Sequence, residues 1–148
     1  MSKNMNVLFY GNGGAGNHGC EAIVRGTVQI LGEVTYTIIS ENVAEDIQYG
    51  LDSISKIIPA KADRRRDFSF LKAYTKLKLT GNYTDMDGWH YLPVIRELHN
   101  CAGVALSVGG DNYCYGNTAI YGYLNAAYKK NHIKTVLWGC SIEPDVVK

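Results

Sequence analysis

Three segments rich in glycine and polar residues have the composition of ligand-binding loops, and each follows a short apolar run. They are residues 11–21 (GNGGAGNHGCE), 109–116 (GGDNYCYG) and 139–145 (GCSIEPD). In the first segment, five of the nine residues from Gly11 to Gly19 are glycine. Glycine allows sharp backbone turns, and free N–H groups ahead of a helix attract anionic ligands. The same composition also suits a tight turn between a strand and a helix that binds nothing.

The first segment also satisfies the pattern of a dinucleotide-binding loop. Gly11, Gly13 and Gly16 match G-x-G-x-x-G after an apolar run, and Glu41 lies near the position of the acid that binds a ribose. The helix, however, is predicted to begin only after Gly19, which places Gly16 in a longer loop instead of at the contact between helix and strand. An NAD(P)-dependent oxidoreductase domain therefore remains an alternative. The spacing of its glycines fits this alternative better than the predicted position of Gly16 does.

Other catalytic patterns are incomplete. Ser141 follows Gly139 and Cys140 as in a nucleophile elbow, but Glu143 stands in place of the second glycine and no histidine follows. These departures exclude a serine hydrolase. The four histidines show no pairing four residues apart, and the four cysteines form no C-x-x-C pair, so no metal site is predicted. Only His18, inside the glycine-rich segment, is retained as a candidate functional histidine.

The segments between these loops alternate between the two periodicities of secondary structure. Short apolar and β-branched runs predict strands at residues 6–10, 34–40, 57–58, 103–108 and 135–139. Apolar spacings of three and four residues predict helices at residues 19–31, 45–50, 68–79 and 93–98, and a last helix through residue 130 that Asn117 caps. Strands separated by helices predict an α/β fold, a Rossmann-like three-layer sandwich with a mostly parallel sheet. All three loops then lie at the carboxyl edge of the sheet, where such folds bind ligands.

Composition restricts the class of protein. The chain of 148 residues has 15 Lys and Arg against 14 Asp and Glu, with 46% apolar residues and only 3 Pro, as expected for one globular domain. The net charge of +1 gives no general attraction for nucleic acid. The apolar run at residues 7–11 is too short for a signal peptide or a membrane span. A cytoplasmic protein with reduced cysteines is therefore predicted.

One stretch departs from this even balance of charge. Residues 61–79 carry seven Lys or Arg against two Asp. A solvated helix face is the common explanation for such a run, and weak peripheral contact with anionic lipid is the alternative. The apolar face of Phe70, Leu71, Tyr74 and Leu77 is expected to pack against the core, so any contact with a membrane would be weak and sensitive to salt.

Three stretches together resemble the polysaccharide pyruvyl transferase family. They are GNGGAGNHGCEAIVRG from residue 11, VALSVGGDNY from residue 104 and TVLWGCSIEP from residue 135, in the order and approximate spacing of the family. The resemblance implies a GT-B-type protein of two Rossmann-like domains, of which residues 1–148 are similar to the N-terminal one. It also implies transfer of a pyruvyl group from phosphoenolpyruvate to two hydroxyls of a polysaccharide sugar as a cyclic ketal, with release of phosphate. No cofactor besides this donor substrate is expected.

For the residues of this chain, the resemblance implies the acceptor side and one wall of a cleft, with most donor-binding residues in a C-terminal half. Asp111, directly after two glycines at a strand end, is the candidate catalytic residue, and capping of the following turn is its alternative role. Tyr113 and Tyr115 offer flat faces for a pyranose ring. The other candidate substrate-binding residues are Asn12, Gly16, Asn17, His18, Gly19, Glu21, Gly109, Gly110, Asn112, Ser141 and Glu143. A non-catalytic sugar-binding module remains a third possibility.

Overall fold

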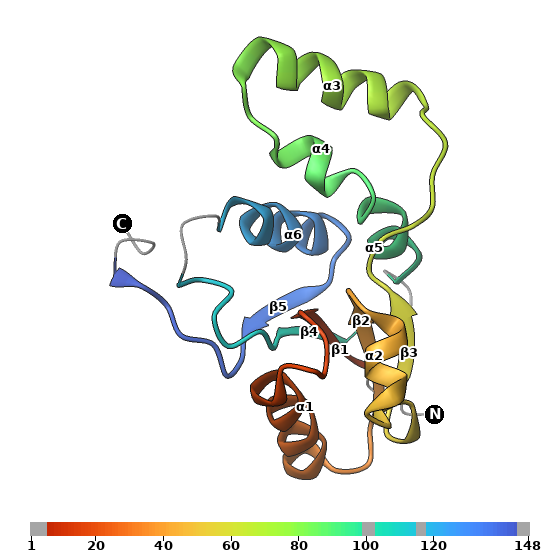
Figure 1. The fold of residues 1–148 in the computed structure, drawn as a ribbon, viewed down its shortest axis with the longest axis vertical. Coiled ribbons are helices and arrows are strands. Elements are labelled where there is room, and N and C mark those ends of the chain that lie inside the picture. Colours follow the sequence, from red (N-terminus) through yellow and green to blue (C-terminus); the bar gives the residue numbers. More distant parts are fainter. Residues whose placement is uncertain (1–5, 99–102, 115–117, 145–148) are drawn as a thin grey trace.

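The computed structural model describes residues 6–98, 103–114 and 118–144, which form an α/β fold around a parallel sheet (Figure 1). The strands are β1 (Asn6–Asn12), β2 (Thr35–Ser40), β3 (Lys56–Pro59), β4 (Val104–Ser107) and β5 (Lys134–Leu137). They are all parallel and lie in the order β3-β2-β1-β4-β5. The predicted Rossmann-like α/β class is confirmed.

Helices cover both faces of this sheet. They are α1 (His18–Leu31), α2 (Val43–Gln48), α3 (Phe68–Thr80), α4 (Thr84–Gly88), α5 (Leu92–Leu98) and α6 (Ala119–Lys130), with a short 3-10 helix at Leu51–Ser53. The helix α1 lies against one face of the sheet, whereas α5 and α6 lie against the other (Figure 1). Among the helices of the described residues, none is both long and apolar enough to cross a membrane.

The side chains of β1 pack on both faces of the sheet. Val7 and Phe9 are buried on the side of α1, and Leu8 and Tyr10 are buried on the side of α5 and α6. Because side chains alternate along a strand, an uninterrupted apolar run is what a central strand between two helical layers requires. The first strand therefore lies in the middle of the sheet, and its carboxyl end leads directly into the glycine-rich loop.

The order of the strands reverses between β1 and β4. The chain moves outward from β1 to β2 and β3, and then returns to place β4 on the other side of β1. In open parallel sheets, ligands bind in the crevice that such a reversal leaves at the carboxyl ends of the strands. Here Asn12 ends β1, and Gly109 and Gly110 follow β4 closely. The topology thus places the first two candidate loops on the two sides of this crevice.

The helices α3 and α4 form a hairpin that projects from the sandwich. The helix α4 packs against α6, and α3 packs against α4, so α3 is the outermost element at the top of Figure 1. Within α3 only Ala73 is buried, while Leu71 is 56% exposed and Tyr74 is 41% exposed. The prediction that this apolar face packs against the core is therefore wrong. Periodicity identifies one face of a helix, but it does not show whether another element covers that face.

Trp89, directly after α4, anchors this hairpin. Its side chain is only 3% exposed, and the ring of Phe70 meets it edge-on with 5.3 Å between the ring centroids. The guanidinium of Arg64 lies 4.3 Å from the centroid of the Trp89 ring and donates to the Trp89 carbonyl at 2.8 Å. Arg64 is consequently a structural residue of the hairpin, although the sequence counts it with the basic residues of a solvated face.

The start of α1 and the presence of α4 differ from the sequence prediction. The helix α1 begins at His18 with Asn17 as its N-cap, earlier than the predicted start after Gly19. The short helix α4 is not predicted, because five residues give too little apolar periodicity. Asn117, the predicted cap of α6, lies outside the described residues.

Candidate functional site

The structure brings the three candidate loops together at the carboxyl edge of the sheet. The side-chain amide of Asn112 donates from Nδ2 to the carbonyl of Gly11 at 3.0 Å, which joins the second loop to the first. The N–H of Ser141 donates to the carbonyl of Gly110 at 2.8 Å, which joins the third loop to the second. Three segments far apart in the sequence thus form one continuous edge.

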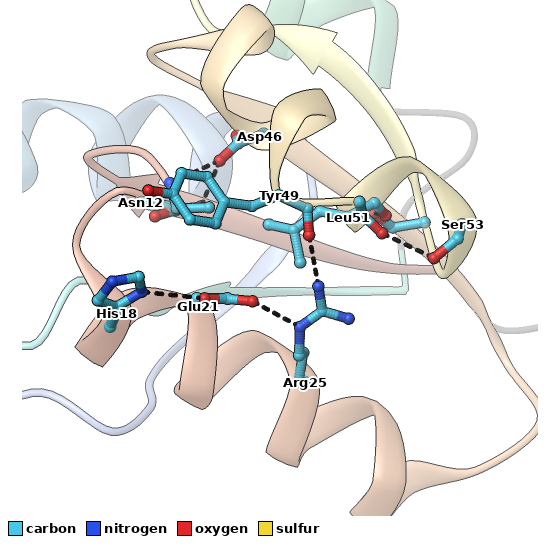
Figure 2. Close-up of polar contacts among 11 residues, drawn as sticks. Asn12, His18, Glu21, Arg25, Asp46, Tyr49, Leu51 and Ser53 are labelled. Carbon is cyan, nitrogen blue, oxygen red and sulfur yellow. Dashed lines mark hydrogen bonds and ion pairs between the residues drawn. The ribbon is translucent and has the colours of Figure 1, made fainter.

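The glycine-rich loop is held from inside by two buried polar residues. Asn12 is fully buried, and its Oδ1 accepts from the N–H of Gly14 at 3.2 Å. Asp46 of α2 is also fully buried, and its Oδ1 accepts from the N–H of Ala15 at 2.9 Å and from Asn12 Nδ2 at 3.5 Å (Figure 2). Asn12 therefore holds the loop, and the predicted contact of its side chain with a sugar hydroxyl is corrected to this structural role.

A second carboxylate of α2 lies directly against the loop. A Cβ atom at Gly14 or at Gly16 would overlap the carboxylate of Glu45, so the absence of side chains at both positions is what admits it. The other oxygen of Asp46, Oδ2, has no hydrogen-bond partner among the described residues. Two acidic side chains thus border the place where a dinucleotide loop would hold pyrophosphate. Their charge opposes an anion there.

The first turn of α1 carries a chain of polar side chains. Glu21 accepts from Arg25 Nε at 2.8 Å, and its other oxygen lies 3.3 Å from His18 Nδ1 (Figure 2). Arg25 also donates to the carbonyl of Tyr49 at 2.6 Å. The hydrogen bond from Arg25, followed by that from His18, lowers the pKa of Glu21 below its usual value. Glu21 is therefore an anchored carboxylate that can accept hydrogen bonds but is a poor proton donor at neutral pH.

Asn17 and Gly19 have local structural roles. Asn17 Oδ1 accepts from the N–H of Gly19 at 3.1 Å, which caps α1. His18, by contrast, has a side chain that is 75% exposed at the edge of the loop. Asn17 is also exposed, but its Oδ1 is engaged in the cap, so His18 is the more open of the two side chains to a ligand.

Asp111 lies exposed in the turn after β4. Its backbone carbonyl accepts from the N–H of Cys114 at 3.0 Å, but within the described part of the chain its carboxylate has no hydrogen-bond partner. The alternative role of turn capping by the side chain therefore has no hydrogen bond to support it in these residues. An exposed carboxylate without a partner at a strand end is free to accept a proton or a hydrogen bond from a ligand.

Asn112 fills the crevice between β1 and β4. Besides its bond to the carbonyl of Gly11, its amide group lies so close to Gly11 and Gly109 that a Cβ atom at either position would overlap it. Gly11 also has a φ of 72°, in the region that favours glycine. The two glycines thus allow one side chain to close the crevice, and the Asn112 amide nitrogen is committed to the protein itself.

Tyr113 points into the protein and does not offer an open face to a sugar. Its side chain is 6% exposed, and its ring packs at 5.4 Å from that of Tyr121. Its hydroxyl donates to Ser107 Oγ at 3.5 Å and accepts from Asn125 Nδ2 at 3.3 Å, while Asn125 Oδ1 accepts from the buried Tyr10 hydroxyl at 2.5 Å. Burial is the main cause that raises the pKa of Tyr10. The expected role of Tyr113 as an exposed stacking surface is therefore corrected to that of a core residue.

The third loop adds exposed side chains to the same edge. The N–H of Glu143 donates to the carbonyl of Tyr113 at 3.2 Å, so residues 141–143 run alongside the second loop. Ser141 and Glu143 are both exposed. Tyr115, the other predicted stacking residue, lies outside the described residues. Among the described residues, the exposed polar side chains at this edge thus include those of His18, Asp111, Ser141 and Glu143.

Glu41, the candidate ribose-binding acid, already has two partners. Its Oε1 accepts from the Tyr91 hydroxyl at 2.7 Å, and its Oε2 lies 3.0 Å from Lys61 Nζ. Burial and the bond to Glu41 raise the pKa of Tyr91 above its usual value. Sequence reasoning missed Tyr91, because its separation of 50 residues from Glu41 leaves no local pattern.

The described residues hold no group of three His, Cys, Asp or Glu side chains placed to bind a metal ion.

Comparison with known proteins carries no argument about this chain's activity. No family model matches the chain, and no curated protein matches its sequence. One similar solved structure is that of a predicted subunit of tRNA methyltransferase from Methanocaldococcus jannaschii, which is 12% identical with a TM-score of 0.46 over 90% of this chain and 68% of that one. At this identity and TM-score, nothing about the activity of that protein is transferred to this chain.

Proposed function

We propose that this chain is the acceptor-side wall of a pyruvyl transferase-like enzyme, which forms a cyclic ketal on a sugar from phosphoenolpyruvate. The observation that carries the proposal is the hydrogen bonding of Asn112 to Gly11 and of Ser141 to Gly110. These bonds join the three stretches that resemble the family into one edge at the strand ends, where ligands bind in open parallel sheets.

Asp111 has the role of the acid–base group in this proposal. Its exposed carboxylate accepts the proton of a sugar hydroxyl as that oxygen attacks the central carbon of phosphoenolpyruvate. The terminal enol carbon takes up a proton as its double bond to the central carbon becomes a single bond. The second hydroxyl then closes the ketal by displacing phosphate, which leaves with the proton of that hydroxyl as hydrogen phosphate. Ser141 and Glu143 are the neighbouring exposed groups that hydrogen-bond the sugar.

The donor's phosphate and carboxylate need cations that the described residues of this edge do not offer. Arg25 is hydrogen-bonded to Glu21, and Lys61 is paired with Glu41. The donor-binding groups are therefore assigned to a second domain. It follows that residues 1–148 alone fold but release no phosphate from phosphoenolpyruvate. Phosphate release by this chain at an ordinary enzymatic rate would contradict the two-domain proposal.

The proposal is tested in a protein that contains both domains. Asp111→Asn is expected to lower turnover by about 100-fold or more with little change in stability. Asp63→Asn, at another exposed carboxylate, is the matched control and should leave turnover unchanged. Normal turnover in Asp111→Asn would remove the catalytic role. Sugar binding without any phosphate release by the wild type would favour the non-catalytic sugar-binding module.

The dinucleotide alternative is weaker than the transferase proposal. Asp46 and Glu45 border the loop where pyrophosphate would bind, and Glu41 is engaged by Tyr91 and Lys61.

A location in the cytoplasm is also part of the proposal. What supports it is that the three described cysteines form no disulfide.

A further inference from the structure

A cavity of about 400 Å³ lies between the α3–α4 hairpin and the helices α5 and α6. Side chains from all four helices and from Trp89 line it. None of its lining residues belongs to the three loops at the carboxyl edge of the sheet. Cavities that hold small molecules commonly have volumes of about 300–1,000 Å³, so this one is large enough for a compact ligand.

Positive charge dominates the wall of this cavity. Lys72 and Lys76 of α3, Arg96 of α5 and Lys130 of α6 line it, against one acidic side chain, Asp85 of α4. Lys76 forms an ion pair with Asp85. Lys72 and Lys130, on opposite helices, form no ion pair with any described residue. Two unpaired ammonium groups from separate elements therefore border one hollow.

Packed aromatic side chains form another part of the wall. The ring of Tyr123 lies against the backbone of Gly88 so closely that a Cβ atom there would overlap it. Trp89 is fixed by Arg64 on its ring and by a hydrogen bond from its Nε1 to Ser69 Oγ at 2.8 Å. This part of the wall is thus rigid and apolar.

The Tyr123 hydroxyl adds a donor to the cavity. It has no hydrogen-bond partner among the described residues. Burial, followed by the nearby carboxylate of Asp85, raises the pKa of this hydroxyl, so it remains protonated at neutral pH. A neutral donor beside two free ammonium groups suits an acceptor-rich anion.

We infer that this cavity binds a phosphorylated small molecule, with its phosphoryl oxygens between Lys72 and Lys130 and its apolar or ring portion against Tyr123. A phosphate group carries about two negative charges and several strong acceptors, which matches two ammonium groups and a hydroxyl. A second copy of the chain would bring the same positive charge, so self-association through this surface is disfavoured. The inference is independent of the proposed transferase activity.

The test is calorimetric titration of the 148-residue chain with inorganic pyrophosphate at constant ionic strength. Saturable binding is expected, and the double variant Lys72→Gln/Lys130→Gln is expected to weaken it by about tenfold or more. The matched control is Lys78→Gln/Lys129→Gln, which removes the same charge from the same two helices but at positions that do not line the cavity. The control should keep its affinity within about twofold, because exposed charges that do not line the cavity are screened by salt.

Three results would overturn the inference. They are the absence of saturable binding at millimolar pyrophosphate, equal weakening in both double variants, and unchanged affinity in Lys72→Gln/Lys130→Gln. Anionic phospholipid vesicles distinguish the source of the phosphate group. Vesicle binding that free pyrophosphate displaces, and that Lys72→Gln/Lys130→Gln abolishes, identifies a lipid headgroup as the ligand. Vesicle binding without any pyrophosphate binding contradicts a phosphate site.

Discussion

The glycine-rich loop and the cavity under α3 differ in how their polar groups are used. In the loop, the N–H groups of Gly14 and Ala15 are already bonded to Asn12 and Asp46. In the cavity, the amino group of Lys72 has no ion-pair partner among the described residues. The loop has the stronger sequence pattern. The cavity, however, has the polar groups that are more available to bind a ligand.

This difference separates two uses of a polar residue. A buried donor or acceptor must be paired within the protein, and the pairing then contributes to stability. A donor left unpaired at a concave surface is kept for solvent or for a ligand. Substitutions in the loop should therefore change the free energy of unfolding, while substitutions in the cavity should change ligand affinity and leave folding intact.

The largest effect is expected for Asp46→Ala. The substitution leaves the Ala15 N–H without its acceptor and the Asn12 amide without its partner in a buried site. We expect a loss of about 3 kcal/mol in the free energy of unfolding, measured by urea denaturation. Asp52→Ala, at an exposed position near the same helix, should change it by less than about 0.5 kcal/mol. Equal stability of the two variants would mean that the loop is not held from inside.

A smaller effect is expected for Gly16→Ala, because the new methyl group overlaps the Glu45 carboxylate. The expected loss is about 1–2 kcal/mol, most of which should disappear when Glu45→Ala is present as well. Gly13→Ala is the control, since no atom lies within 4 Å of a Cβ atom placed there. If the cost of Gly16→Ala persisted in the Glu45→Ala background, its cause would be the backbone and not this carboxylate.

Only weak binding to anionic membranes is expected from the outer face of α3. Phe68 is 82% exposed, Leu71 is 56% exposed and Leu79 is 80% exposed, within the basic stretch of residues 61–79. We expect detectable sedimentation with anionic vesicles at low salt, lost near physiological ionic strength, because each basic residue contributes only about 1 kcal/mol near such a surface.

The variant for this experiment is Arg65→Gln/Arg66→Gln. Arg64 is left in place because it stacks on Trp89, and its loss would disturb the hairpin itself. The double variant should remain in the supernatant at low salt. Equal recovery of the wild type with anionic and neutral vesicles would leave α3 as an ordinary solvated helix.

The smallest effect is expected for nucleotide addition. Because Asp46 and Glu45 border the loop, NAD and NADP should raise the melting temperature no more than an unrelated nucleotide does. A micromolar dissociation constant for NAD, weakened in Glu41→Ala, would instead restore the oxidoreductase alternative and reverse the interpretation of the loop.

The sequence is sufficient to predict the strands, the parallel sheet and the edge where the loops meet. A continuous apolar run such as Val7–Tyr10 requires cover on both faces, and parallel strands direct their carboxyl ends to one edge. Asp111 could be placed at that edge because it directly follows Gly109 and Gly110 at the end of an apolar run. These predictions depend on local patterns and on topology, which the sequence carries.

Side-chain contacts between distant segments could not be predicted in this way. Asp46 lies 31 residues from Ala15, and Asn125 lies 115 residues from Tyr10, so neither pair leaves a local spacing to detect. Tyr113 looks like an exposed aromatic of a loop until Tyr121 of α6 is seen to cover it. Which neighbour covers a side chain depends on tertiary packing, and periodicity alone does not contain it.

The projection of α3 also has a kinetic consequence for the whole molecule. With only Ala73 buried, α3 can detach without exposing the sheet, so its amides should exchange with solvent through local opening. The amides of β1, where Leu8 and Phe9 are fully buried, should exchange only when the whole domain unfolds. Because Lys72 of α3 lines the cavity, a bound ligand should make the opening of α3 less favourable. The amides of α3 should thus exchange more slowly when that ligand is present.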